Sequence, residues 1–275
     1  MSKSQSDVSH DSNAEDESAL ESLAKSGDAN AMLRLTYYYI TSDNQRLEKA
    51  ASWCRKAAEL GNAEAQYKFG EICIDGLGVP QNFQEGIQWW LLAAQQGNVR
   101  AQTALGKSYI RGSWIEKNFR EGIHWLELAS DADDAAASLF LAKLYEDAES
   151  GHRDDQLAIK WYFIAANQGS MRAQHNLGCR FRAGDGVPLD FKAAVKWLRL
   201  AAIQGHPEAQ FALSTMFSEG MGVEKDEKEA DRLLKLAAAG GETDALFILE
   251  VRGELDSVPK IGNSFERLVA RLQKP

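Results

Sequence analysis

Residues 173–210 read AQHNLGCRFRAGDGVPLDFKAAVKWLRLAAIQGHPEAQ, a stretch that begins and ends with the same Ala-Gln pair. The two pairs are 36 residues apart, and a column of aromatic residues keeps the same step along the chain. That column consists of Trp53, Trp89, Trp125, Trp161 and Trp197, with Leu233 in the next slot. Because only seven of the 275 residues are tryptophan, five of them at one spacing indicate an internal repeat. A period of this length predicts a stack of repeated structural units.

Each unit is expected to contain two helices. Ala101, Leu105 and Tyr109 lie four residues apart, which places them on one stripe of a first helix. A glycine-rich turn, as in Gly184-Asp-Gly-Val, is expected to close that helix. The second helix is expected to begin at an Asn or Asp that caps it, namely Asn82, Asn118, Asp190 and Asp226. A further glycine ends it, at Gly61, Gly97, Gly169, Gly205 and Gly241.

Small residues also keep the 36-residue step and predict close helix packing. The three columns are Ala65, Ala101, Ala137, Ala173, Ala209 and Ala245; Gly76, Gly112, Ala148, Gly184 and Gly220; and Ala50, Gly86, Gly122, Ala158, Ala194 and Ala230. A single helix pair cannot bury its apolar surface, whereas a stack of pairs can. We therefore expect the tryptophans to fill space between helix pairs rather than to bind a ligand.

The chain resembles the Sel1-like repeat family, which is related to the tetratricopeptide repeats. The resemblance rests on a pattern with the elements Ala173-Gln174, Leu177-Gly178, Gly184-Asp-Gly-Val187, Trp197 and Ala201-Ala202, repeated over about Gly27 to Val251. It implies an all-α fold, a right-handed α/α superhelix or solenoid of about six helix pairs. Residues 18–251 would form the solenoid. Residues 1–17 are expected to be a disordered acidic tail, and residues 252–275 a linker and a capping helix that starts near Asn263.

The resemblance also implies a function. Members of the family bind other proteins, so we expect a non-enzymatic scaffold or adaptor with a protein or peptide partner. Some bacterial relatives are immunity proteins that neutralise a secreted toxin, and this is the alternative. A hydrolytic enzyme is a further alternative, which the sequence disfavours because it has no Gly-x-Ser-x-Gly or His-Glu-x-x-His motif.

Composition excludes several other classes. Acidic residues outnumber basic ones by 40 to 31, which argues against a nucleic-acid or anionic-membrane partner. The most apolar run, at residues 89–94, is far shorter than a membrane span of about 20 residues. Three widely spaced cysteines, Cys54, Cys73 and Cys179, fit reduced thiols. We expect a cytoplasmic monomer.

No catalytic residue, metal ligand or cofactor site is predicted. His175 and Cys179 lie four residues apart on one helix, so both could face one metal ion. Two ligands do not make a site, and no third His or Cys occupies a registered neighbouring position.

A groove is predicted where the resemblance to tetratricopeptide stacks places the ligand-facing side of the first helices. The candidate residues are Tyr67, Arg100, Lys107, Arg111, Lys143, Arg172, His175, Arg182 and Phe211. A basic centre flanked by aromatic residues favours a partner with an acidic segment. The alternative is that these charges belong to an ordinary solvated helix face.

Two places depart from the repeat. The third unit lacks the Gly-x-Gly-Val turn at residues 147–154 and has an acidic loop at residues 130–134 instead of the terminal glycine. These loops are either a hinge or partner-facing insertion, or ordinary drift of a surface loop. Trp114 stands in another turn, as either a packing plug or an exposed binding anchor.

Overall fold

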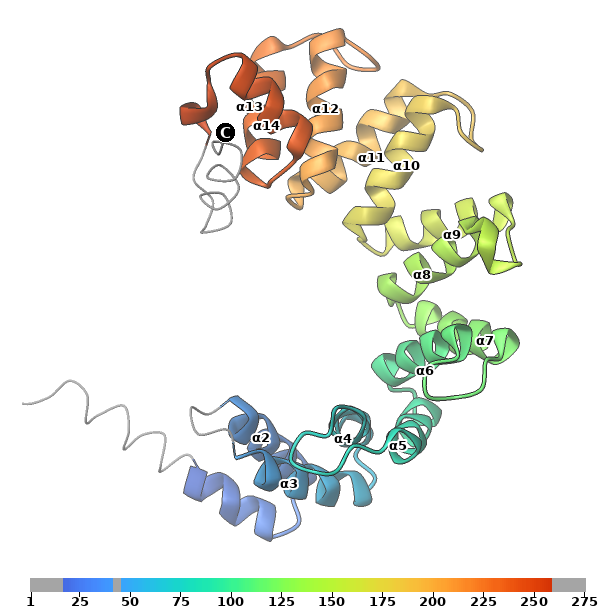
Figure 1. The fold of residues 1–275 in the computed structure, drawn as a ribbon, viewed down its shortest axis with the longest axis vertical. Coiled ribbons are helices and arrows are strands. Elements are labelled where there is room, and N and C mark those ends of the chain that lie inside the picture. Colours follow the sequence, from blue (N-terminus) through green and yellow to red (C-terminus); the bar gives the residue numbers. More distant parts are fainter. Residues whose placement is uncertain (1–16, 42–45, 259–275) are drawn as a thin grey trace, which may run out of the picture. The chain divides into compact units, whose positions relative to one another are not determined.

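A computed structural model describes residues 17–41 and 46–258 of the chain (Figure 1). All regular structure in these residues is helical, as the repeat predicts. Residues 17–25 are helical and precede the following helices: α2 Ala29–Thr41, α3 Leu47–Glu59, α4 Ala63–Asp75, α5 Phe83–Gln95, α6 Val99–Arg111, α7 Phe119–Asp131, α8 Ala135–Glu146, α9 Asp155–Asn167, α10 Met171–Ala183, α11 Phe191–Ile203, α12 Pro207–Glu219, α13 Glu227–Ala239 and α14 Thr243–Val251. Two short 3-10 helices are η1, Ala148–Ser150, and η2, Leu255–Ser257.

The helices pack in the predicted pairs. Even-numbered helices from α2 to α12 are the first helices of the repeats, and the odd-numbered helices from α3 to α13 are the second helices that pack on them. The predicted caps of the second helices are confirmed: Asn82 accepts a hydrogen bond from the backbone N–H of Glu85 at 3.1 Å, and Asp190 accepts one from Ala193 at 3.0 Å. These bonds satisfy N–H groups that have no partner inside the helix.

The glycine-rich turn has a steric cause. Gly184 ends α10 in the left-handed conformation, with φ of 71°. Gly186, two residues later, is also left-handed, and a Cβ there would lie 2.5 Å from Cδ1 of Ile159 in the preceding second helix. A side chain at Gly186 would therefore be strained in its backbone and would also clash with the neighbouring repeat.

The Ala-Gln pair ties one repeat to the next. In four repeats the glutamine is buried, and its Nε2 donates to a carbonyl near the end of the preceding second helix. The bonds run from Gln66 to Ala58, Gln102 to Ala94, Gln174 to Ala166 and Gln210 to Ala202, at 3.0–3.2 Å. Each of these carbonyls also accepts from the backbone N–H of the glycine that ends the helix, at 2.9–3.2 Å, so the glutamine adds a second donor from the next repeat.

The buried column of the second helices is not the tryptophan column alone. The residue that follows each position of the tryptophan column belongs to a second column, whose side chains are all 6% exposed or less. This second column consists of Cys54, Trp90, Leu126, Tyr162, Leu198 and Leu234. Among the repeated tryptophans, Trp161 and Trp197 are buried, while Trp53, Trp89 and Trp125 are only partly so. The tryptophans pack between helices as predicted, but the extent of their burial differs between repeats.

The atypical third unit keeps its register through local substitutes. Asp133 stands where the other repeats have the terminal glycine, and it adopts the same left-handed conformation, with φ of 63°. After α8 the chain forms η1, and Gly151 takes the left-handed conformation with φ of 73°. Asp154 then caps α9 by accepting from the N–H groups of Gln156 and Leu157.

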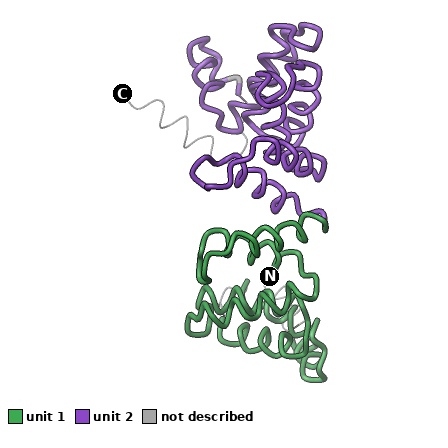
Figure 2. The backbone as a smooth tube through the Cα atoms, turned by 90° about the vertical axis from the view of Figure 1, so that its right-hand side faces the viewer, with its two compact units in different colours: residues 1–132 green, residues 133–275 purple. Residues whose placement is uncertain are grey.

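The chain divides into two compact units, residues 1–132 and residues 133–275 (Figure 2). The boundary falls in the acidic loop at residues 130–134 that replaces the usual glycine. Unit 1 has cores that run from α2 to α6, and unit 2 has cores around α11 to α14. The predicted capping helix near Asn263 and most of the predicted acidic tail lie outside the described residues.

Candidate protein-interaction surfaces

In unit 1 the predicted groove residues belong to a network of paired charges. Arg100 of α6 donates from Nη1 to Oε1 of Glu64 of α4 at 3.1 Å, and Asn98 and Tyr37 donate to the same carboxylate at 2.9 and 3.4 Å. The Glu64 carboxylate raises the pKa of Arg100, so the guanidinium stays charged. Arg100 is therefore already partnered within the chain.

Tyr67 is likewise held in place. Its hydroxyl donates to Oε1 of Glu71 at 2.7 Å, and its ring stacks on Trp90 with centroids 6.2 Å apart. Burial and the Glu71 carboxylate both raise the pKa of the Tyr67 hydroxyl. Lys107 is half-buried and Arg111 is exposed at the end of α6, and neither side chain is without a partner.

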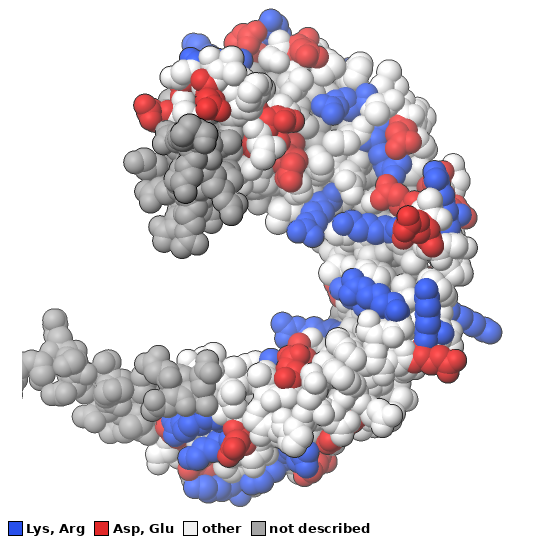
Figure 3. All heavy atoms as spheres, viewed as in Figure 1, with Lys and Arg blue, Asp and Glu red and all other residues white. Residues whose placement is uncertain are grey.

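Among the described residues of unit 2, the predicted cations have no side-chain partner. Lys143 of α8 and Arg172 of α10 are exposed, and Arg182 of α10 is half-buried. None of the three forms a side-chain hydrogen bond or ion pair with any residue in the described ranges 17–41 and 46–258. We call Lys143, Arg172 and Arg182 the unit 2 cations. Figure 3 shows Lys and Arg side chains over α8 and α10 on the face toward the viewer.

The repeat explains this difference between the units. Glu64 and Arg100 occupy the same position in successive repeats, so their side chains meet across neighbouring first helices. At the same position, Arg172 has Ala136 before it and Glu208 after it. Glu208 lies 3.0 Å from Nδ1 of His206, and Ala136 offers no carboxylate. Arg172 is thus left without the acid that pairs with Arg100.

Between α10 and α12, two histidines stack. The rings of His175 and His206 lie 4.8 Å apart with an interplanar angle of 18°. Nε2 of His175 lies 3.4 Å from Sγ of Cys179. Burial lowers the pKa of both histidines; His206 and Arg182 lower that of His175 further, while Glu208 opposes the shift. These causes favour neutral imidazoles in the folded protein.

The stack of His206 on His175 was not predicted from the sequence, because His206 belongs to none of the 36-residue columns of recurring residue type. His206 occupies the cap position of α12. At this position in other repeats, side chains cap α4, α6, α8, α10 and α14, namely those of Asn62, Asn98, Asp134, Ser170 and Glu242. Its own side chain makes no cap bond, and Pro207 follows it. The sequence does contain a signal for this stack: a histidine stands where other repeats have a capping residue. Because its imidazole does not cap the helix, the ring can pack against another residue.

The two aromatic candidates, Phe211 and Trp114, differ in exposure. Phe211 is half-buried and packs against the core cluster around α13 and α14. Trp114 has features of both predicted roles, the packing plug and the exposed anchor. It is 47% exposed, and it stacks on Phe83 with ring centroids 5.7 Å apart. Its φ of 65° is unusual for a residue with a side chain, and it occupies the slot that holds the second glycine of the turn in other repeats.

Over residues 17–41 and 46–258, no three His, Cys, Asp or Glu side chains come together as a metal-binding group. Within the same residues, no helix has both the length and the apolar character that crossing a membrane requires.

The Sel1 repeat model matches residues 29–62, 63–98, 99–134, 135–170, 172–206 and 207–242. A search of curated proteins found no match. Among solved structures, one similar chain is a protective antigen present in uropathogenic Escherichia coli strains and described as displaying an SLR fold. It is 29% identical, with a TM-score of 0.77 over 93% of this chain and 56% of that one. The present chain thus spans little more than half of the antigen's length.

Two other solved structures extend the comparison. A Sel1 repeat protein from Oxalobacter formigenes is 29% identical, with a TM-score of 0.66 over 76% of this chain and 87% of that one. An immunity protein from Pseudomonas aeruginosa is 18% identical, with a TM-score of 0.44 over 90% of this chain and 89% of that one.

Proposed function

Because this chain belongs to the Sel1 repeat family, whose members typically serve as protein-interaction scaffolds, we propose that it binds a partner protein through the first helices of unit 2, α8, α10 and α12. The partner presents an acidic segment to the unit 2 cations. The chain itself carries out no catalysis and acts by holding its partner.

The observation that carries this proposal is the absence of carboxylate partners for the unit 2 cations among the described residues. A charged guanidinium that is not paired within its own chain is available to a partner's carboxylate, and such charge-assisted bonds are stronger than neutral ones. In unit 1, by contrast, Arg100 would first have to give up its bond to Glu64.

Electrostatic complementarity of this kind acts mainly on partner choice and on the rate of association. Binding should therefore weaken as salt rises, because exposed charges are screened within about 8 Å at physiological ionic strength. An apolar interface would show much less dependence on salt.

The test is capture of partners from cells that express the protein, with the full chain as bait. Replacing all three unit 2 cations with Glu should abolish capture of a partner that the wild type retains at low salt. The matched control is Lys160→Glu, Lys192→Glu and Lys228→Glu, three exposed lysines on the second helices α9, α11 and α13. This control makes the same change in net charge and should leave capture intact.

Equal capture by both triple variants would contradict the proposal, provided that both variants retain the wild-type circular dichroism spectrum. The identity of the captured protein also separates a general scaffold from an immunity protein. A secreted toxin as the retained partner, with relief of its toxicity on co-expression, would assign the immunity role.

A further inference from the structure

The tryptophan column ends at Leu233, and the structure has a hollow at that point. In the preceding repeat, Trp197 of α11 is 8% exposed, and its ring packs at 6.0 Å from the ring of Phe163 of α9. Phe163 in turn packs at 6.0 Å from Phe181 of α10. Three aromatic rings thus fill the space between successive second helices in this repeat.

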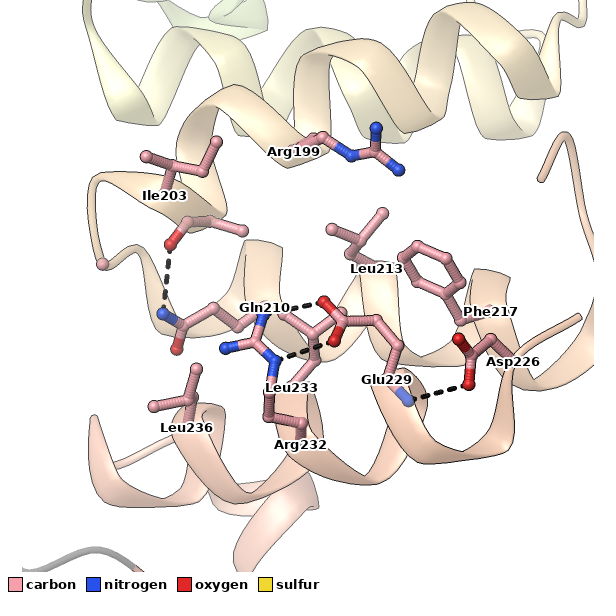
Figure 4. Close-up of a pocket in the computed structure, with 12 residues that line it drawn as sticks. Arg199, Ile203, Gln210, Leu213, Phe217, Asp226, Glu229, Arg232, Leu233 and Leu236 are labelled. Carbon is pink, nitrogen blue, oxygen red and sulfur yellow. Dashed lines mark hydrogen bonds and ion pairs between the residues drawn. The ribbon is translucent and has the colours of Figure 1, made fainter. Parts of the chain in front are cut away.

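One repeat later, the equivalent residues are Arg199, Phe217 and Leu233. Two of the three rings are absent, and a cavity of about 530 Å³ lies between α11, α12 and α13. Figure 4 shows Ile203, Leu213, Phe217 and Leu233 around this space. We call it the Leu233 pocket. Its volume is within the range of ligand sites, roughly 300–1,000 Å³.

Beside the pocket lies a cation, Arg199, that has no ion-pair partner among the described residues. Arg199 is exposed, and its guanidinium carbon lies 5.9 Å from the centre of the Phe217 ring. It forms no ion pair with any residue in the described part of the chain. Two acids, Asp226 and Glu229, also line the pocket, and Glu229 is held by Arg232 through two hydrogen bonds of 2.8 and 2.7 Å.

An earlier repeat shows what this arrangement looks like when it is complete. Arg55 and Glu85 are equivalent to Arg199 and Glu229, and they form an ion pair at 3.3 Å. In that repeat the ring of Trp89 also packs at 5.6 Å from Phe69, where the Leu233 pocket has Leu213. The complete arrangement thus contains an indole ring and a carboxylate that pairs with the arginine. Around Leu233 the indole is absent, and the equivalent carboxylate of Glu229 is bound by Arg232 instead of Arg199.

We propose that the Leu233 pocket is a docking site for a partner peptide that inserts a tryptophan side chain and pairs an adjacent carboxylate with Arg199. The chain's own repeats supply the template, because an indole fills the equivalent space and a carboxylate pairs with the equivalent arginine. This site lies between α11, α12 and α13 and does not include the unit 2 cations on α8 and α10.

The experiment uses the N-acetylated, C-amidated dipeptide Trp-Asp as the probe, titrated into the full-length protein. Binding is followed by amide chemical shifts, and the expected shifts cluster at α11, α12 and α13. Leu233→Trp restores the repeat's own ring and should weaken probe binding at least about tenfold, which is a loss of about 1.4 kcal/mol. Its melting temperature should stay the same or rise, because the cavity is filled.

Two matched comparisons test the carboxylate. Arg199→Glu should weaken binding of Trp-Asp severalfold, and Lys196→Glu, an exposed lysine on the same helix, should not. Replacing the probe with Trp-Asn should reproduce the loss on wild-type protein and have little effect on Arg199→Glu. If Leu233→Trp fails to fold, Leu213→Phe offers a second filling variant, since Phe69 holds that position in an earlier repeat.

Several results would overturn the proposal. One is equal probe binding by wild type and by both filling variants. Another is a set of shifts outside α11 to α13. Shifts in probe-free protein that depend on its concentration would make a second copy of the chain the occupant, and contacts from residues 259–275 would make the chain's own segment the occupant.

Discussion

Gly106→Ala is the substitution that tests the packing account most sharply, because two effects of known size oppose each other. Alanine is favoured over glycine inside a helix by about 1 kcal/mol. A Cβ at Gly106, however, would lie 2.6 Å from Cγ of Leu126 and 2.9 Å from the carbonyl oxygen of Gly122. The Leu126 side chain is fully buried, and the oxygen belongs to the backbone of α7.

Overpacking of a core costs about 1–3 kcal/mol, and a clash with backbone places this site at the upper end. Subtracting the helix-propensity gain leaves a net loss of about 2 kcal/mol. For a chain of this size that is a fall in melting temperature of about 4–8 °C. Thermal and urea denaturation followed by circular dichroism measure it directly.

The same column supplies the control. Ala142 holds the equivalent position in the third unit, opposite Ala158, where the structure accepts a methyl group on both sides. Ala142→Gly should also destabilise, by about 1–2 kcal/mol, because it loses helix propensity and leaves a small void. If helix propensity alone governed this column, Gly106→Ala would be stabilising by about 1 kcal/mol, and that result would refute the packing argument.

Three further predictions follow from burial and backbone geometry. Trp197→Ala should lower the free energy of unfolding by about 3–5 kcal/mol and Trp125→Ala by roughly half as much, since Trp197 is buried and Trp125 only partly so; urea titrations measure both. Because burial lowers the pKa of His175 and His206 in the folded state, the unfolded chain binds more protons and stability falls as pH drops below about 6.5. Melting curves from pH 7.5 to 5 should show a smaller fall for the double Gln variant, and parallel curves would contradict this. Asp133→Gly should stabilise by about 0.5–1 kcal/mol in thermal melts, because glycine adopts φ of 63° without strain, and a lower melting temperature would count against it.

Sequence pattern predicted the repeat, the helix pairs and the helix ends almost residue by residue. Asn118 caps α7 and Gly112 closes α6 as expected, because caps and left-handed turns depend on local chemistry that a single residue type provides. The pattern was less informative about burial. Trp89 and Trp90 are adjacent and both aromatic, and only the packing of α5 against Gly70 makes Trp90 the buried one.

The predicted basic groove illustrates the same limit. Arg100 and Arg172 occupy equivalent positions in their repeats. Arg100 is paired with Glu64, whereas Arg172 has no acidic partner in the part of the chain that the structure describes. The repeat spacing already places Glu64 beside Arg100, so this pairing could have been read from the columns. The stack of His175 on His206 could not have been read from the columns. It depends on the His206 side chain, which does not cap α12 and instead packs against His175 of α10.

Site-specific photo-cross-linking tests the central claim, that a partner binds the first helices of unit 2. A photoreactive phenylalanine analogue replaces Met171, which is 40% exposed and precedes Arg172 on α10, or replaces Leu92, which is 45% exposed on the second helix α5. Irradiation in cells that express the protein should attach the same partner at position 171 and not at position 92. A partner attached only at position 92, or equally at both, would contradict the account.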